Sequence, residues 1–318
     1  MRRQIEWTSF TVINPLQRYI SLRPVILWLN GRRIDRYLSD QIDERSRAGG
    51  RHAGAARRHP SILDLLLEDR EKDDIRIEGN GEIKDAMIPQ IRAFLFGGHD
   101  TTSSTLLYCY YLLAEHPAVL NKVRAEHDEV FGADPTESQN LIDNGPYLLN
   151  KLPYTTAVIK EVLRLFPPAA SMRIGRPGAT IVDDDGRVYP TEGCNVWTLT
   201  LAIHRNPRVW PDPEAFKPER WLVDPGHELY PVKGAWRPFQ HGPKNCLGQP
   251  LAMLELKICL VMTLREFTVT PAYEEWDSTR PRRGVRTVNG HRAYQAEKGG
   301  GGAHPADGFP VRVTLRKR

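Results

Sequence analysis

The chain has 318 residues, 40% hydrophobic and 26% charged, a balance that supports a buried core and excludes a collagen-like chain, a disulfide scaffold and a wholly disordered protein. Its four cysteines are scattered and form no closely spaced pair, so we expect reduced thiols. The net charge of +5 is uneven: residues 1–58 and 280–318 are strongly basic, whereas residues 59–279 hold 22 basic and 32 acidic side chains. Without interleaved aromatic residues or a nucleic-acid motif, these basic ends predict no nucleic-acid partner.

The first part of the chain is predicted to be helical, with one interruption. Residues 16–45 place aliphatic side chains and arginines at helical spacing, and residues 49–60 resemble a flexible linker. Residues 61–71 show an amphipathic helical pattern with Ser61 as a candidate N-cap. The chain start lacks the apolar run of a signal peptide, and no stretch reaches the roughly 18 apolar residues of a membrane span. The chain as given is therefore not expected to cross a membrane.

The middle of the chain is dominated by one long helical pattern from Glu82 to Glu115. Its only proline, Pro89, lies near the start, where a helix tolerates it. About 33 residues at 1.5 Å each would span on the order of 50 Å, so this helix is expected to cross a whole domain. Further helices are predicted at 117–130, 153–165 and 251–264, and β-prone pieces at 179–183, 187–190, 195–203 and 311–315. Long helices followed by short strands indicate an α-rich fold with minor β-structure.

The clearest chemical signal surrounds Cys246, in the segment FQHGPKNCLGQPLAMLE (239–255). Gly242 and Gly248 let the backbone approach a flat ligand, and N–H groups near the start of the following helix favour a thiolate. A lone thiolate held in this way is a natural axial ligand for haem iron. The alternative is a buried structural cysteine, which is the interpretation we keep for the other three cysteines.

A second motif, GGHDTT (97–102), lies midway along the long helix. Adjacent glycines cost about 1 kcal/mol each in a helix interior, so their presence needs a reason. A helix opened at Gly98 could leave room for a bound gas molecule, with Asp100 and Thr101 offering an acid and a hydroxyl. Taken alone, the motif is equally well explained as a local kink.

A third motif, EVLR (161–164), places Glu161 and Arg164 three residues apart on one helix face, where they can pair. The plainest interpretation is a surface ion pair, which contributes little to stability.

Together these motifs resemble the cytochrome P450 family. The family's cysteine signature has the form F-x-x-G-x-[basic]-x-C-x-G, and GGHDTT, EVLR and PERW (218–221) occur in the family's order. The positions that fill the signature are Phe239, Gly242, Lys244, Cys246 and Gly248. The resemblance implies that Cys246 is the axial ligand of haem b, that Lys244 and Arg173 hold the haem propionates, and that Phe239 packs near the cysteine sulfur.

The resemblance also gives roles to the other two motifs. Thr101 would hold the hydrogen bonds around iron-bound oxygen, and Asp100 would relay protons to it. Glu161 would be buried between two arginines as a determinant of the fold. The three members of this triad are Glu161, Arg164 and Arg220 of PERW. His99 and His241 are interpreted as packed or loop histidines, not as iron ligands.

The implied fold is the mainly α P450 fold with small β-sheets, as a single domain (1–318) that lacks its N-terminal portion. We divide it into residues 1–60, residues 61–168 with GGHDTT and EVLR, and residues 169–318 with PERW and the cysteine loop. The implied reaction is monooxygenation of an apolar small molecule, with electrons from NADPH through cytochrome P450 reductase. The segment NGRRIDRYL resembles fungal P450s of secondary metabolism, which implies the cytosolic face of the endoplasmic reticulum, with membrane association only through the missing part.

A basic surface near the cysteine loop is a candidate docking face for an acidic reductase. Its residues are Lys233, Arg237, Lys244 and Lys257.

The sequence departs from the family pattern in two places in the loop. Gln240 replaces a common glycine, and Lys244 replaces the more frequent arginine, which keeps the cation but loses the planar two-pronged hydrogen bond. Two alternatives therefore stay open: a non-catalytic remnant of a P450, and a haem-binding protein without monooxygenase activity.

Overall fold

The structure is a computed structural model that describes residues 23–49, 61, 63–65, 81–279, 286–297 and 302–316. The linker expected at 49–60 and most of the helix expected at 61–71 lie outside these residues. The chain forms two compact units, residues 1–99 with 299–301, and residues 100–298 with 302–318. The division falls inside helix α5 (Gly81–Glu115), between His99 and Asp100.

The first unit is built on α3 (Arg23–Gly49) and the first half of α5. Leu38 and Ile42 are buried against Met87 and Ile88. Three ion pairs tie charged groups of this unit together, namely Lys84–Asp43 at 2.6 Å, Arg92–Asp35 at 2.9 Å and Arg45–Asp64 at 3.1 Å. The Asp64 N–H also donates to Ser61 Oγ at 3.2 Å. This hydrogen bond confirms Ser61 as a helix N-cap.

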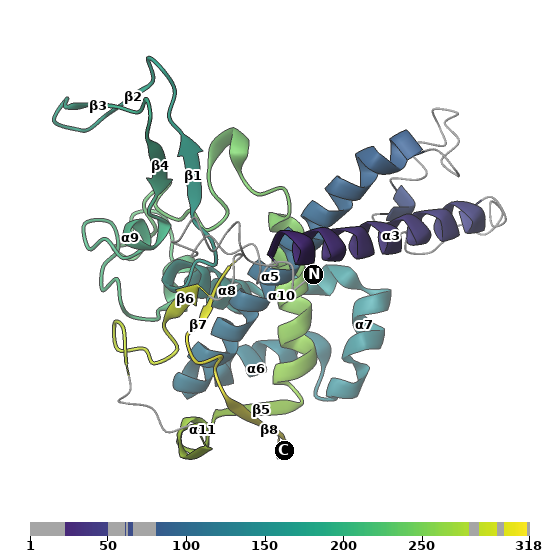
Figure 1. The fold of residues 1–318 in the computed structure, drawn as a ribbon. Coiled ribbons are helices and arrows are strands. Elements are labelled where there is room, and N and C mark those ends of the chain that lie inside the picture. The colour runs from purple at the N-terminus through teal and green to yellow at the C-terminus, as the bar shows by residue number, and fades with distance from the viewer. Residues whose placement is uncertain are drawn as a thin grey trace. The chain divides into compact units, whose positions relative to one another are not determined.

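The second unit is mainly helical (Figure 1). Helices α6 and α8 begin with a proline at their first turn, where the missing N–H costs nothing. The helices after α5 are α6 (Pro117–Phe131), α7 (Ser138–Asn144), α8 (Pro153–Leu165), α9 (Thr200–His204), α10 (Gln249–Leu264) and α11 (Tyr273–Thr279). The helices predicted from the sequence at 82–115, 117–130, 153–165 and 251–264 are confirmed to within two residues.

The strands of the described residues form four separate antiparallel pairs. Strand β1 (Ser171–Ile174) pairs with β4 (Asn195–Thr198), β2 (Thr180–Val182) with β3 (Val188–Pro190), β5 (Phe267–Pro271) with β8 (Val311–Leu315), and β6 (Gln295–Glu297) with β7 (Ala303–Pro305). The strand predicted through residue 203 is wrong beyond Thr198. Residues 200–204 form α9 instead, whose His204 turns inward and is fully buried.

The main core of the second unit lies between α5, α8 and α10. Tyr108 of α5 stacks on Phe166, which follows α8, with ring centroids 4.1 Å apart. Val162 and Leu260 are fully buried in the same cluster. Because α8 is buried along most of its length, the side chains of EVLR enter the interior and do not lie on the surface.

The carboxyl end of α10 is fastened by two buried arginines. Arg124 of α6 donates from Nε to the Leu264 carbonyl at 2.9 Å and from Nη2 to the Phe267 carbonyl at 3.0 Å. Arg265 pairs through Nε with Asp128 at 3.2 Å and donates from Nη1 to Ser138 Oγ at 2.5 Å. Arg124 thus satisfies the Leu264 carbonyl left free at the helix end, and both cations oppose the partial negative charge of that end.

Within the part of the chain that the structure describes, none of the helices has the length and apolar character needed to span a bilayer.

Candidate functional site

Cys246 lies in a tight loop directly before α10. The Cys246 N–H donates to the Phe239 carbonyl at 2.8 Å, which closes the loop around the short helical turn Gly242–Lys244. Gly242 has a φ of 79°, a left-handed conformation that side chains disfavour. A Cβ added at Gly248 would lie 3.7 Å from the Cys246 sulfur, so this glycine keeps one side of the thiol clear. The thiol itself is exposed and free.

Gln240 shows why the loop favours glycine at its position. Its φ of 66° is left-handed, and a residue with a Cβ pays roughly 1–2 kcal/mol there. The Gln240 N–H donates to the Arg237 carbonyl at 3.1 Å, which fixes the turn. The departure noted in the sequence therefore places a residue with a Cβ in a strained backbone conformation.

The surface around the thiol suits a flat apolar group. Leu247, next to Cys246, is 90% exposed, and Leu251 in the first turn of α10 is half exposed. No group of three or more His, Cys, Asp or Glu in the described residues could chelate an ion. A single thiol beside apolar surface and backbone N–H groups matches the donor that haem iron takes from a protein. The residues present therefore fit a haem.

The two expected propionate partners are exposed cations. Lys244 ends the short helical turn before the cysteine. Arg173 lies on β1, where its Nη1 donates to the Met172 carbonyl at 2.9 Å. Among the described residues neither side chain forms an ion pair, so both have charge available for an anionic group.

The GGHDTT motif lies inside an uninterrupted part of α5. A Cβ added at Gly97 or at Gly98 would meet nothing within 4 Å, so open space adjoins this turn of the helix. Thr101 accepts at its carbonyl a hydrogen bond from Thr105 Oγ1 at 2.9 Å. Asp100 is bonded at both carboxylate oxygens, to the backbone N–H of Gly302 and to His304 Nε2.

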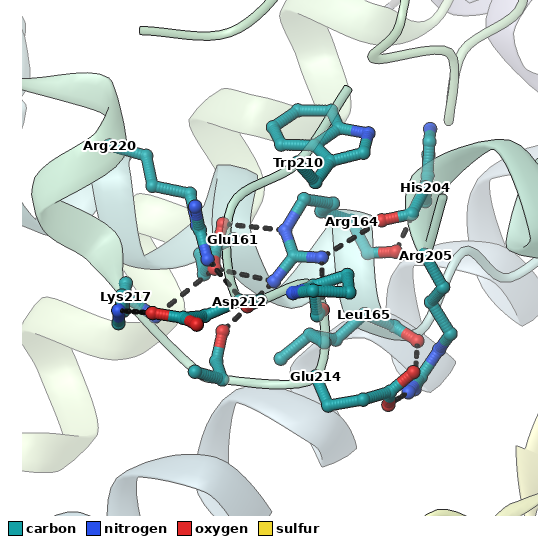
Figure 2. A network of polar contacts seen from close by, with 12 residues as sticks. Glu161, Arg164, Leu165, His204, Arg205, Trp210, Asp212, Glu214, Lys217 and Arg220 are labelled. Carbon is teal, nitrogen blue, oxygen red and sulfur yellow. Dashed lines mark hydrogen bonds and ion pairs between the residues drawn. The ribbon is translucent and has the colours of Figure 1, made fainter. Parts of the chain in front are cut away.

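Glu161 lies between two arginines in the interior (Figure 2). Arg164 grips the carboxylate at two points, from Nη2 to Oε1 at 2.7 Å and from Nε to Oε2 at 3.0 Å. Arg220 adds a contact from Nε to Oε1 at 3.2 Å, and Trp221 donates from Nε1 to Oε2 at 3.1 Å. All three side chains of the triad are fully buried.

The remaining donors of the Glu161 triad tie distant loops to α8. Arg164 donates from Nη1 to the carbonyls of His204 and Pro213 at 2.9 and 2.6 Å, and Trp210 lies over its guanidinium (Figure 2). Arg220 donates from Nη2 to the Asp212 carbonyl at 2.7 Å. The triad therefore fixes the loop between α9 and PERW onto α8.

His204 links this triad to the segment before the cysteine loop. Its Nε2 accepts the Arg237 N–H at 2.8 Å, so its Nδ1 carries the proton and donates to the Arg164 carbonyl at 3.0 Å. Burial lowers the pKa of His204 to about 4, aided by the nearby charges of Arg164 and Arg205. A protonated ring could no longer accept from Arg237.

This histidine predicts a loss of stability in mild acid. The unfolded chain protonates His204 near pH 6.5 and the folded chain only near pH 4, so the unfolded state binds more protons between these values. The free energy of unfolding should fall as the pH drops through this window, by up to about 1.4 kcal/mol per pH unit from this group. Urea unfolding of the wild type and His204→Asn at pH 7, 6 and 5 measures the difference, and equal slopes for both would contradict the assignment.

Sequence reasoning missed His204, Trp221, Gly302 and His304. Each meets its partner through contacts far apart in the chain, as with Asp100 and His304, so local spacing gave no sign of them. The run GGGG (299–302) was the one visible signal, because a glycine where backbone approaches a carboxylate is expected.

The cysteine loop before a helix, the buried Glu161 triad and the long α5 occur together in one mainly helical fold. Residues 3–292 match the cytochrome P450 family, and the chain belongs to that family.

Curated relatives extend this similarity over most of the chain. It is 40% identical over 314 residues to the cytochrome P450 monooxygenase polC of Polytolypa hystricis, covering 98% of this chain and 56% of that protein. It is 33% identical to the cytochrome P450 monooxygenase acrF of Aspergillus aculeatus, covering 96% and 63%. With the cytochrome P450 monooxygenase PC-23 of Penicillium crustosum it shares 37% identity over 66% of this chain and 100% of that protein. The chain thus spans somewhat more than half the length of the first two relatives.

Proposed function

We propose that this chain carries the haem-binding part of a monooxygenase that acts on an apolar small molecule of fungal secondary metabolism. The observation that carries the proposal is the free, exposed Cys246 thiol at the start of α10, in a loop closed by the Phe239 carbonyl. The names of the three fungal relatives support the reaction class. Bound haem would supply the activation of O2, with one oxygen atom entering the substrate and the other leaving as water.

The chain's own residues would then bind the haem, orient it and deliver protons to the reacting oxygen. Cys246 would ligate the iron as a thiolate, and Lys244 and Arg173 would neutralise the propionates. On α5, Thr101 would hold hydrogen bonds near the reacting oxygen, and Asp100 would deliver protons to it. The Glu161 triad would keep α8 and the loop before the cysteine in place.

The electrons would come from NADPH through cytochrome P450 reductase at the cytosolic face of the endoplasmic reticulum. Of the four cations expected at a docking face, Lys233 and Lys244 are exposed. Arg237 and Lys257 instead donate to the backbone carbonyls of Gly234 and Leu149. Because Lys244 would hold a propionate, Lys233 is the cation of this surface best able to meet an acidic reductase.

The test uses the full chain supplied with haem, reductase, NADPH and isotopically labelled O2. We expect stoichiometric haem uptake and one labelled oxygen atom in the product of an apolar substrate. A chain that binds haem but incorporates no label from any of a broad panel of apolar compounds would be a haem protein without oxygenase activity. A chain that takes up no haem would be a non-catalytic remnant. Either of these last two results overturns the proposal.

A further inference from the structure

The carboxylate of Asp100 is held by residues about 200 positions further along the chain. Its Oδ1 lies 3.0 Å from His304 Nε2, and its Oδ2 accepts the Gly302 N–H. An ionised carboxylate only accepts hydrogen bonds, so His304 Nε2 carries the proton in this contact. Both oxygens of a predicted proton-relay group are thus fixed by the β6–β7 hairpin.

Further hydrogen bonds hold the two strands β6 and β7 against α5 and the turn after α8. Ser104, one turn beyond Asp100 on α5, is fully buried and donates from Oγ to the Ala303 carbonyl at 2.5 Å. The Ala303 N–H donates to the Pro168 carbonyl at 2.9 Å, and Gln295 Nε2 donates to the Pro167 carbonyl at 2.9 Å. Strand β7 therefore runs between α5 and the turn after α8, with bonds to both.

Gly302 permits the close approach. A Cβ at this residue would lie 3.2 Å from Asp100 Oδ2 and 3.4 Å from the Pro168 carbonyl, which is tighter than ordinary contact. Its backbone N–H can reach the carboxylate because no side chain intervenes. The side chains of Asp100 and His304 are 15% and 21% exposed, so the pair is shielded from most of the water while the imidazole retains some access to solvent.

We propose that His304 is a positioning residue for Asp100, which makes the β6–β7 hairpin part of the proton-delivery machinery on α5. The inference rests on the proposed function of Asp100. When both of its oxygens are held, the Asp100 carboxylate keeps one orientation beside Thr101. When it is released, it turns toward the solvent and no longer delivers protons to the reacting oxygen. The same two electrons and two protons then leave with O2 as hydrogen peroxide, in place of giving hydroxylated product and water.

The first measurement concerns the contact and needs no turnover. In the diamagnetic carbon monoxide complex of the ferrous full chain, nitrogen-15 labelled histidine should show a His304 Nε2-bound proton that exchanges slowly with water. Its resonance is identified by its absence in His304→Leu. Asp100→Ala removes the acceptor and should abolish the slow exchange. A proton that exchanges equally slowly in Asp100→Ala would overturn the proposed contact.

The second measurement concerns the role, through the ratio of hydrogen peroxide to product per NADPH consumed. His304→Leu should raise this ratio about tenfold, because a hydrogen bond to a charged group is lost. His304→Gln, which retains an N–H donor, should restore most of the coupling. His227→Gln is the matched control, since His227 is exposed and its ring accepts a hydrogen bond from the nearby Leu229 N–H.

The outcomes separate this proposal from the proposed function. An unchanged peroxide ratio in His304→Leu, with the slow proton present in wild type, would overturn the positioning role and leave the proposed function intact. A wild-type chain that takes up no haem would overturn both the proposed function and the positioning role. A wild-type chain that binds haem but shows no turnover would also overturn both, even if the slow proton were seen. Thermal unfolding of each variant ensures that a change in the ratio does not come from loss of the fold.

Discussion

Glu161→Ala is expected to lower the free energy of unfolding by about 3–5 kcal/mol, because it leaves two buried guanidinium groups without their counter-ion. Arg164 and Arg220 are both fully buried and have no route to water for their charge. A domain of ordinary stability has roughly 5–15 kcal/mol in total, so this single change removes a large fraction of it. Urea unfolding followed by tryptophan fluorescence measures the loss, since Trp221 bonds directly to the carboxylate.

Two further variants keep this prediction testable if Glu161→Ala does not fold. Glu161→Gln retains the shape and part of the hydrogen bonding but removes the charge, and we expect an intermediate loss. Glu219→Gln is the control, because its ion pair with Lys122 at 2.8 Å is largely exposed and such pairs contribute about 1 kcal/mol or less. Equal losses of unfolding free energy for Glu161→Gln and Glu219→Gln would show that burial of the triad does not increase its contribution to stability.

Cys246→Ala is expected to abolish the red-shifted Soret band that the carbon monoxide complex of thiolate-ligated ferrous haem produces. The other cysteines are poor candidates for physical reasons. Cys109 is completely buried, and burial raises the pKa of its thiol far above the usual range. Burial also raises the pKa of Cys259. Only a thiolate makes this strong axial bond, so a shielded thiol is disfavoured.

Cys194→Ala is the matched control for the cysteine test. The expectation that Cys194 is a buried structural cysteine is wrong, because this thiol is also free and exposed. It lies directly before β4 and not at the start of a long helix. The absorption spectrum of the reduced, carbon monoxide-treated protein should therefore be unchanged in Cys194→Ala and lack the thiolate band in Cys246→Ala. The opposite pattern, or a thiolate band in both variants, would refute the assignment of the ligand.

The sequence predicted well those elements whose limits are local. Pro117 and Pro153 mark the starts of α6 and α8 because proline suits the first turn of a helix, and both starts are confirmed. The strand after Asn195 was overextended because the pattern of β-branched and apolar residues continues beyond Thr198, where the chain instead turns to bury His204. Strand β1 was missed because it is short and its register is set by pairing with β4.

The residues of the candidate site also divide into those that a local pattern predicts and those whose contacts depend on tertiary packing. Motif spacing paired Glu161 with Arg164, the family resemblance added Arg220, and the structure brings these side chains together. Spacing could not show that Asp100 meets His304, because that contact depends on how the last part of the chain returns to α5. Local sequence records which groups a site uses, whereas their partners depend on tertiary packing.

The buried arginines at the carboxyl end of α10 have a consequence for the opposite end of that helix. Arg124 fixes the Leu264 carbonyl, and the helix between this anchor and the cysteine loop has 16 residues, about 24 Å of rigid backbone. One inserted residue would move the thiol by about 1.5 Å and rotate the loop by about 100°. The number of residues between the anchor and Cys246 is thus not free to vary. The length of α10 therefore determines the position of the Cys246 sulfur relative to the anchored end of the helix.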